Sequence, residues 1–132
     1  MSQMHVKGHI LILDDDLDIQ NLLIHGLKSQ GYRVSQFYDA KSALEALEDP
    51  ASELRSLDIV LCDIQLPGMD GLNFIKLFRQ LKIETPIILM TAFASLEIAI
   101  QAIRLVAIDF LKKPFTVPEL LVSVEITLRL HK

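Results

Sequence analysis

The chain has 132 residues, of which 51% are hydrophobic, and its formal net charge is -4 at pH 7. This length and apolar content suit one domain with a single core. The acidic balance and the lack of any block of Lys or Arg argue against direct binding to nucleic acid or to an anionic membrane. No apolar run reaches the roughly 20 residues of a membrane span, and no signal peptide opens the sequence, so we expect a cytoplasmic protein.

Short apolar runs alternate with helix-like segments along the chain. Five runs have the length and flanking residues expected of strands, at residues 10–13, 32–38, 59–62, 86–90 and 108–111. Several are apolar without alternation, which is typical of central strands covered on both faces. The second run is more mixed in polarity, and we therefore place it at an edge of the sheet.

Helical periodicity predicts five helices, carried by apolar residues within 19–27, 43–47, 72–78, 96–105 and 120–130. Gly31 is the expected stop of the first helix, and Asp39 is the expected N-cap of the second. Thr116 and Glu119 form a capping box at the start of the fifth. Strict alternation of strands and helices predicts a parallel sheet with helices on both faces.

Polar residues follow four of the predicted strands. Asp14 and Asp15 follow the first, Asp63 the third, Thr91 the fourth and Lys113 the fifth. In such a sheet these positions converge on one crevice, where close carboxylates repel unless a cation such as Mg2+ lies among them. A carboxylate there can act as a nucleophile toward a phosphoryl group. The metal and the lysine ammonium would neutralise charge on the transferring group, and the threonine hydroxyl would donate a hydrogen bond.

Other interpretations of the first acidic run were weighed by spacing. A calcium-binding loop fits Asp14, Asp16 and Asp18 but lacks the glycine and the glutamate that such a loop requires. A phosphatase of the haloacid dehalogenase type fits Asp14 and Asp16, although the glycine and threonine of its signature are absent, and it stays open as an alternative. Asp16 or Asp18 also suits the N-cap of the first helix.

Four motifs in order resemble the receiver domain of bacterial two-component response regulators. They are LDDD at residues 13–16, DIQLPGMDG at 63–71, MTA at 90–92 and DFLKKPF at 109–115. The resemblance covers the chain from about residue 10 onward. It implies a doubly wound, flavodoxin-like fold with a five-stranded parallel sheet in the order 2-1-3-4-5. It also implies a single receiver domain over residues 1–132, which can be the N-terminal part of a longer protein.

The same resemblance assigns roles to the acidic residues. It implies that Asp63 accepts a phosphoryl group from a sensor histidine kinase or a histidine phosphotransfer protein. Asp15, Asp63 and the backbone carbonyl of Gln65 would ligate Mg2+, with Asp14 reaching the ion through water. Such a domain is regulatory rather than an enzyme, since it catalyses only its own phosphorylation and dephosphorylation.

Three further residues complete the implied machinery. Lys113 and Thr91 would assist phosphoryl transfer, and the bond from Lys113 to Pro114 resembles one that is cis in receivers. Thr91 and Phe110 would form the switch that relays the phosphorylated state to the fourth helix, fifth strand and fifth helix. Two alternatives remain: a receiver-like binding module that signals without phosphate, and a metal-dependent hydrolase.

The predicted fourth and fifth helices each carry a second apolar stripe. The stripe of the fifth helix consists of Val122, Ile126 and Leu130, and a similar one runs along the fourth. One stripe of each helix must pack on the sheet, so the other is surplus. Surplus apolar surface indicates an interface, and we expect a homodimer or a partner contact through these two helices.

Overall fold

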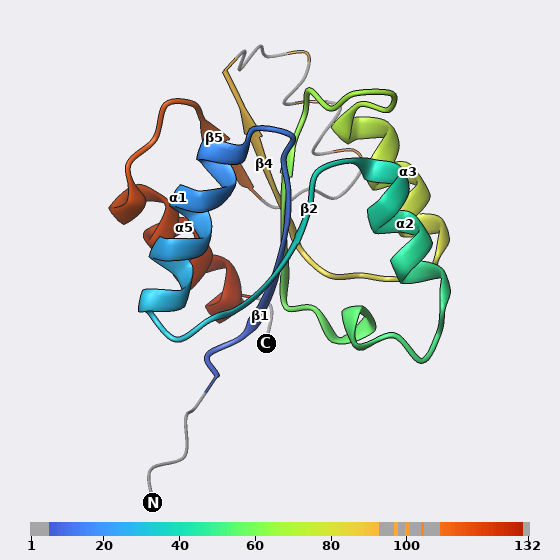
Figure 1. Cartoon of the computed structure of the whole chain (residues 1–132), viewed down its shortest axis with the longest axis horizontal. Helices are drawn as coiled ribbons and strands as arrows, with labels where there is room; N and C mark the ends of the chain where they lie inside the picture. The colour runs from blue at the N-terminus through green and yellow to red at the C-terminus, as the bar shows by residue number, and fades with distance from the viewer. Residues whose placement is uncertain (1–5, 93–96, 98–99, 101–103, 105–108, 131–132) are drawn as a thin grey trace, which may run out of the picture.

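The computed structural model describes residues 6–92, 97, 100, 104 and 109–130. Its centre is a five-stranded parallel sheet in the order β2-β1-β3-β4-β5 (Figure 1). The strands are β1 (His9–Leu13), β2 (Arg33–Phe37), β3 (Ile59–Asp63), β4 (Ile87–Thr91) and β5 (Asp109–Lys112). The predicted fold class is confirmed, and so is the edge position of the mixed second strand.

Helices cover both faces of the sheet. Figure 1 shows α1 (Leu17–Ser29) and α5 (Val117–Leu130) on one side, and α2 (Ala40–Glu48) and α3 (Gly71–Gln80) on the other. A short 3-10 turn, η1 (Glu53–Ser56), precedes β3 and was not predicted. The predicted fourth helix, at residues 96–105, lies outside the described residues except for positions 97, 100 and 104.

The predicted helix boundaries have identifiable chemical causes. Asp16 caps α1 by accepting hydrogen bonds from two backbone amides of its first turn. Asp39 caps α2 by accepting the backbone amide and the hydroxyl of Ser42. Thr116 and Glu119 exchange hydrogen bonds of 3.2 Å between side chain and backbone amide in both directions, which confirms the capping box. Gly31 follows α1 with a φ of 90°, a conformation that glycine adopts at little cost.

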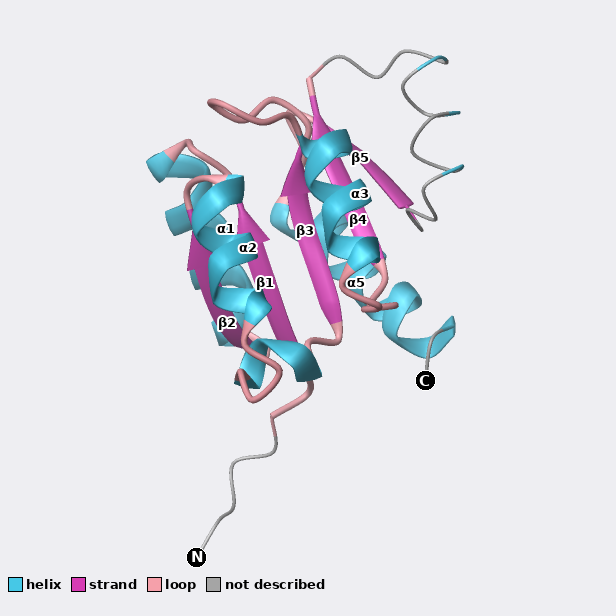
Figure 2. Cartoon of the chain, turned by 90° about the vertical axis from the view of Figure 1, so that its right-hand side faces the viewer, coloured by secondary structure: helices cyan, strands magenta, loops and turns pink. Residues whose placement is uncertain are grey.

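The core consists of two apolar layers, one on each face of the sheet. Because side chains alternate along a strand, Leu11 and Leu13 pack toward α2 and α3, whereas Ile10 and Ile12 pack toward α1 and α5. All five residues of β1, β3 and β4 are buried. Figure 2 shows the sheet from the side of α2 and α3, with the strands running side by side from β2 to β5 behind these helices. Within the described ranges, no helix combines the length and apolar character that crossing a bilayer requires.

Candidate phosphoacceptor site

The acidic residues meet where the central strands end. β1 and β3 are hydrogen-bonded neighbours whose register pairs Leu13 with Cys62. Asp14 and Asp63, each one position further along, therefore lie side by side. Carboxylate oxygens of Asp14, Asp15 and Asp63 all fall within 4.8 Å of one another. The predicted convergence of these three carboxylates is thus what the fold produces.

The three consecutive aspartates after β1 have separate environments. Asp14 is completely buried: its Oδ1 accepts the backbone amide of Asp16 at 2.9 Å and its Oδ2 accepts Lys113 Nζ at 2.9 Å. Asp15 is exposed beside it, and Asp16 caps α1. Burial raises the pKa of Asp14 above its usual value, and the hydrogen bonds from Asp16 and Lys113 only partly oppose that shift.

Lys113 joins the two buried carboxylates. Its Nζ lies 2.9 Å from Asp14 Oδ2 and 3.1 Å from Asp63 Oδ2, and its side chain is 18% exposed. Burial lowers the pKa of this ammonium, but the hydrogen bond and charge of Asp14, followed by those of Asp63, outweigh burial and raise it above the usual value. The backbone amide of Lys113 donates to the carbonyl of Thr91 at 2.8 Å, and the Lys113–Pro114 peptide bond is cis, as the resemblance implied.

Asp63 is fixed by two hydrogen bonds to its side chain and lies against the start of α3. Its Oδ1 accepts the backbone amide of Gln65 at 3.1 Å and its Oδ2 accepts Lys113. Gly71, the first residue of α3, donates its amide to the carbonyl of Ile64 at 2.7 Å. A Cβ at Gly71 would collide with the backbone carbonyl of Asp63, so only glycine allows this approach. Asp63 keeps 7% of its surface exposed, which leaves a narrow opening to solvent.

The residues expected to form a switch lie on neighbouring strands. Thr91 ends β4 and is 1% exposed, and it pairs in register with Lys112 of β5. Phe110 of β5 is half-buried and packs against the apolar layer under α2 and α3. The structure therefore brings Thr91 and Lys113 to the same edge as Asp63. A switching movement of Thr91 and Phe110 stays a prediction, as does coordination by the carbonyl of Gln65.

Gln20 lies beside this site but was not among the site residues predicted from the sequence. Gln20 of α1 is fully buried and donates its side-chain amide to the backbone carbonyls of Asp14 and Phe37. A signal for it exists in the sequence, because Gln20 shares the spacing of Leu23 and Leu27, which form the buried stripe of this helix. A polar residue at a core position calls for a hydrogen-bonding explanation.

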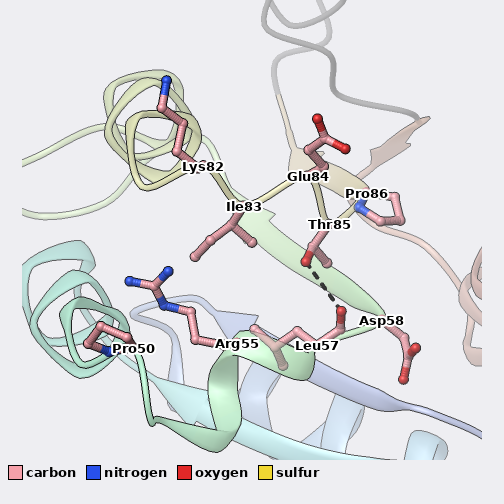
Figure 3. A pocket seen from close by; sticks show the side chains of 9 residues that line it. All are labelled: Pro50, Arg55, Leu57, Asp58, Lys82, Ile83, Glu84, Thr85 and Pro86. Carbon is pink, nitrogen blue, oxygen red and sulfur yellow. Dashed lines mark hydrogen bonds between the residues drawn. The ribbon is translucent and has the colours of Figure 1, made fainter.

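A cavity of about 530 Å³ lies at the opposite edge of the sheet, where the strands begin (Figure 3). Arg55 borders it, but its guanidinium already donates to the carbonyls of Leu47 and Leu81, at the C-terminal ends of α2 and α3. Helix C-termini carry partial negative charge and disfavour an anion there. Asp58 and Glu84 are exposed on its rim. The groups around this cavity do not converge on one point. The candidate site is therefore the other end of the strands, where Asp14, Asp15 and Asp63 lie, which we call the acidic edge.

The acidic edge has a charge pattern that suits a divalent cation. Among the described residues, three carboxylates gather there around one lysine ammonium. Oxygens bound directly to one Mg2+ at about 2.1 Å lie no more than about 4.2 Å apart. Separations of at most 4.8 Å are therefore compatible with carboxylates that bind one ion directly or through water. The donors are all hard oxygens, as Mg2+ prefers.

Comparison with known proteins gives concordant results. The family model described as the response regulator receiver domain matches residues 10–125. The transcriptional regulatory protein FixJ of Bradyrhizobium diazoefficiens is 35% identical over 126 residues, which cover 96% of this chain and 59% of FixJ. The regulatory protein AtoC of Escherichia coli is 36% identical over 128 residues, which cover 97% of this chain and 27% of AtoC.

The fold comparison agrees with the sequence comparison. The crystal structure of full-length FixJ from B. japonicum matches with a TM-score of 0.85 and 34% identity, over 97% of this chain and 61% of that one. The chain thus spans 59% and 27% of the two curated relatives named above. The matched region contains all the residues of the acidic edge.

Proposed function

This chain belongs to the family of response regulator receiver domains, and on that premise we propose that it is a signalling switch activated by phosphorylation of Asp63. One observation carries the proposal: the Asp63 carboxylate lies 3.1 Å from Lys113 Nζ, in a cluster with two further carboxylates and with a small opening to solvent. This arrangement provides a nucleophile, a cation beside it and oxygen ligands for a metal.

The proposed reaction transfers a phosphoryl group from a phosphohistidine. An oxygen of Asp63 forms the new bond to phosphorus while the bond from phosphorus to the donor imidazole nitrogen breaks. The imidazole leaves with the electron pair and takes a proton from solvent. Lys113, already within 3.1 Å of Asp63, neutralises charge that gathers on the phosphoryl oxygens. Receiver domains of this family are phosphorylated by histidine kinases, so the donor is a sensor kinase or a histidine phosphotransfer protein.

Receiver domains bind Mg2+ at an acidic cluster of the kind found here. We assign Asp15 and Asp63 as direct carboxylate ligands, the carbonyl of Gln65 as a third ligand, and Asp14 as a ligand through water. Burial supports the outer role of Asp14, because Asp14 has no exposed surface, whereas Asp15 is exposed and Asp63 keeps 7% of its surface exposed. When bound, the metal supplies positive charge that offsets the charge of the transferring group.

Phosphorylation would be relayed through Thr91 and Phe110. A phosphoryl group on Asp63 carries about two negative charges in place of the single carboxylate charge, and it brings new acceptor oxygens. Thr91 is buried at the adjacent strand end, so its hydroxyl is the group that would move toward those oxygens. Lys113 is already in contact with Asp63, and its movement is the smaller part of the change. Phe110 would then rotate and alter the surface of β5 and α5.

The altered surface is also our proposed dimer or partner interface. Val122, Ile126 and Leu130 of α5 are 55%, 50% and 71% exposed. Of the apolar residues of the predicted fourth helix, Ile100 alone lies within the described residues, and it is 41% exposed. Light scattering with and without phosphorylation tests self-association, and a strict monomer in both states would contradict it. The names of the relatives favour transcriptional regulation as the output, through parts of a longer protein.

Incubation with acetyl phosphate, followed by intact-protein mass spectrometry, tests the function. We expect one phosphoryl group per chain when Mg2+ is present and none when EDTA replaces it. Equal labelling with EDTA would contradict a metal-assisted reaction, and no labelling in either case would favour a binding module without phosphate chemistry. Sustained turnover of simple phosphate esters would instead identify a hydrolase.

A further inference from the structure

Gln20 links the end of β1 at the acidic edge to the outer strand β2. Its Nε2 donates to the carbonyl oxygen of Asp14 at 3.0 Å and to that of Phe37 at 2.8 Å. The Phe37 carbonyl also accepts the backbone amide of Asp14 at 3.2 Å. The amide orientation is fixed by these acceptors, because a flipped amide would direct its own oxygen at two carbonyl oxygens. The side chain therefore anchors the main chain of Asp14.

This anchor has an energetic cost that an apolar residue would avoid. Gln20 is fully buried, and its Oε1 has no hydrogen-bond partner in the described part of the chain. An unsatisfied buried acceptor destabilises a fold. Leu23 and Leu27 line the same buried stripe, so a side chain such as Met would pack there without this cost. Packing alone does not account for a glutamine, whereas placement of Asp14 does.

The placement matters because Asp14 leaves the sheet at this point. The ladder between β1 and its neighbours ends at Leu13. Beyond it, the Asp14 carboxylate must reach Lys113 Nζ at 2.9 Å and stay within 4.8 Å of the oxygens of Asp15 and Asp63. A shift of the Asp14 main chain by about 1 Å would disrupt both relations, and errors of this size are costly in catalytic sites.

We infer that Gln20 is a positioning residue, which holds the main chain of Asp14 through its amide and thereby sets Mg2+ affinity and the rate of phosphoryl uptake. The inference rests on the proposed function. It adds a residue of α1 that touches neither the metal nor the phosphoryl group. Outer partners of metal sites act in this way by fixing the groups in front of them.

The test compares Gln20→Met with Thr85→Val. Thr85 is buried near the opposite edge of the sheet, where its hydroxyl donates to the carbonyl of Leu57 at 3.2 Å. Each variant removes side-chain donation to buried backbone carbonyls with little change of shape. Thermal unfolding over a series of Mg2+ concentrations reports stability without metal and, from the metal-dependent shift, the dissociation constant. Initial rates of labelling by acetyl phosphate are measured in parallel.

We expect Gln20→Met to weaken Mg2+ binding by about tenfold or more and to slow labelling to a similar extent. Thr85→Val should change both by less than about twofold. Equal Mg2+ affinity in Gln20→Met and wild type would overturn the inference. If the wild type neither binds Mg2+ nor accepts a phosphoryl group, the proposed function itself fails, which is a different result.

A second variant and a measurement on the wild type keep the test decisive if Gln20→Met does not fold. Gln20→Asn retains the amide on a side chain that is one methylene shorter. It should bind Mg2+ more weakly than the wild type and, if Gln20→Met also folds, more tightly than Gln20→Met. In the wild type, the side-chain amide protons of Gln20 should exchange slowly with solvent in NMR spectra. Fast exchange would show that the two hydrogen bonds are not formed and would overturn the inference.

Discussion

The two edges of the same sheet use their polar residues differently. At the edge where the strands begin, Arg55 donates to backbone carbonyls, Asp58 accepts the amide of His9 at 2.7 Å, and Thr85 donates to the carbonyl of Leu57. At the edge where the strands end, three carboxylates of the described residues gather, and the ammonium of Lys113 pairs with two of them. The first edge pairs its polar groups with the main chain, whereas the second is left short of positive charge.

This difference identifies the functional edge more clearly than cavity size does. The cavity of about 530 Å³ lies at the internally paired edge, where the bordering groups already hold helix ends and loops. The acidic edge retains unneutralised charge, which creates a demand for a cation. Substitutions at the two edges should therefore separate into those that change chemistry and those that change stability.

The largest expected difference in labelling by acetyl phosphate is between Asp63→Asn and Asp58→Asn. Asp63→Asn removes the nucleophilic carboxylate and should abolish labelling by acetyl phosphate, measured by intact-protein mass spectrometry. Asp58→Asn keeps an oxygen that can accept the His9 amide and should label within about twofold of wild type. Undiminished labelling of Asp63→Asn would show that the acceptor lies elsewhere.

Lys113→Gln should separate catalysis from metal binding. Removing this ammonium takes away a preorganised positive charge, so we expect the initial labelling rate to fall by about 100-fold. Mg2+ affinity, measured by titration calorimetry, should stay equal or increase, because Asp14 and Asp63 lose their positive partner. Lys82→Gln, at the rim of the opposite cavity, is the matched control and should change neither quantity. A parallel loss of Mg2+ binding in Lys113→Gln would contradict the assignment.

Arg55→Met should affect stability alone. The variant removes charged donation to the carbonyls of Leu47 and Leu81, and we expect the free energy of unfolding to fall by about 1 to 3 kcal/mol in urea titrations. Mg2+ affinity should be unchanged, since the site lies at the other end of the strands. A clear loss of Mg2+ affinity in Arg55→Met would contradict the prediction that this residue affects stability alone.

The smallest effect is expected for Asp14→Asn and has a sign that depends on pH. Folding raises the pKa of Asp14 above 3.8, so the protonated carboxyl stabilises the folded state below pH 3.8. This contribution is lost as the pH rises through the raised pKa. At pH 7 without Mg2+, Asp14→Asn should therefore increase the free energy of unfolding slightly. The gain should vanish in acid and reverse at saturating Mg2+; a loss of stability at pH 7 without metal would contradict the raised pKa.

Much of the fold could be read from the sequence because the central strands are buried on both faces. Continuous apolar runs predicted β1, β3 and β4 to within one or two residues, and Asp39 and Thr116 marked helix starts through side-chain capping. The acidic edge followed from the same pattern, since the ends of parallel strands must lie together. Local chemistry was sufficient wherever a feature depended on neighbours in the chain.

Other features depend on contacts between distant segments and could not be predicted in this way. Lys113 contacts Asp14 across 99 positions of sequence, and the bond between Gln20 and Phe37 depends on how α1 lies against β2. The need for glycine at position 71 arises from the close approach of α3 to the Asp63 carbonyl, which excludes a side chain there. The 3-10 turn η1 lacks the periodicity that marks longer helices.

The most direct test of the account is chemical mapping of the phosphorylated residue. The wild-type chain is labelled with acetyl phosphate and Mg2+ and then reduced with sodium borohydride, which converts an aspartyl phosphate to homoserine, and the product is sequenced by tandem mass spectrometry. The account predicts homoserine at position 63, and no conversion when EDTA replaces Mg2+. Conversion at a different aspartate, or at position 63 regardless of metal, would contradict it.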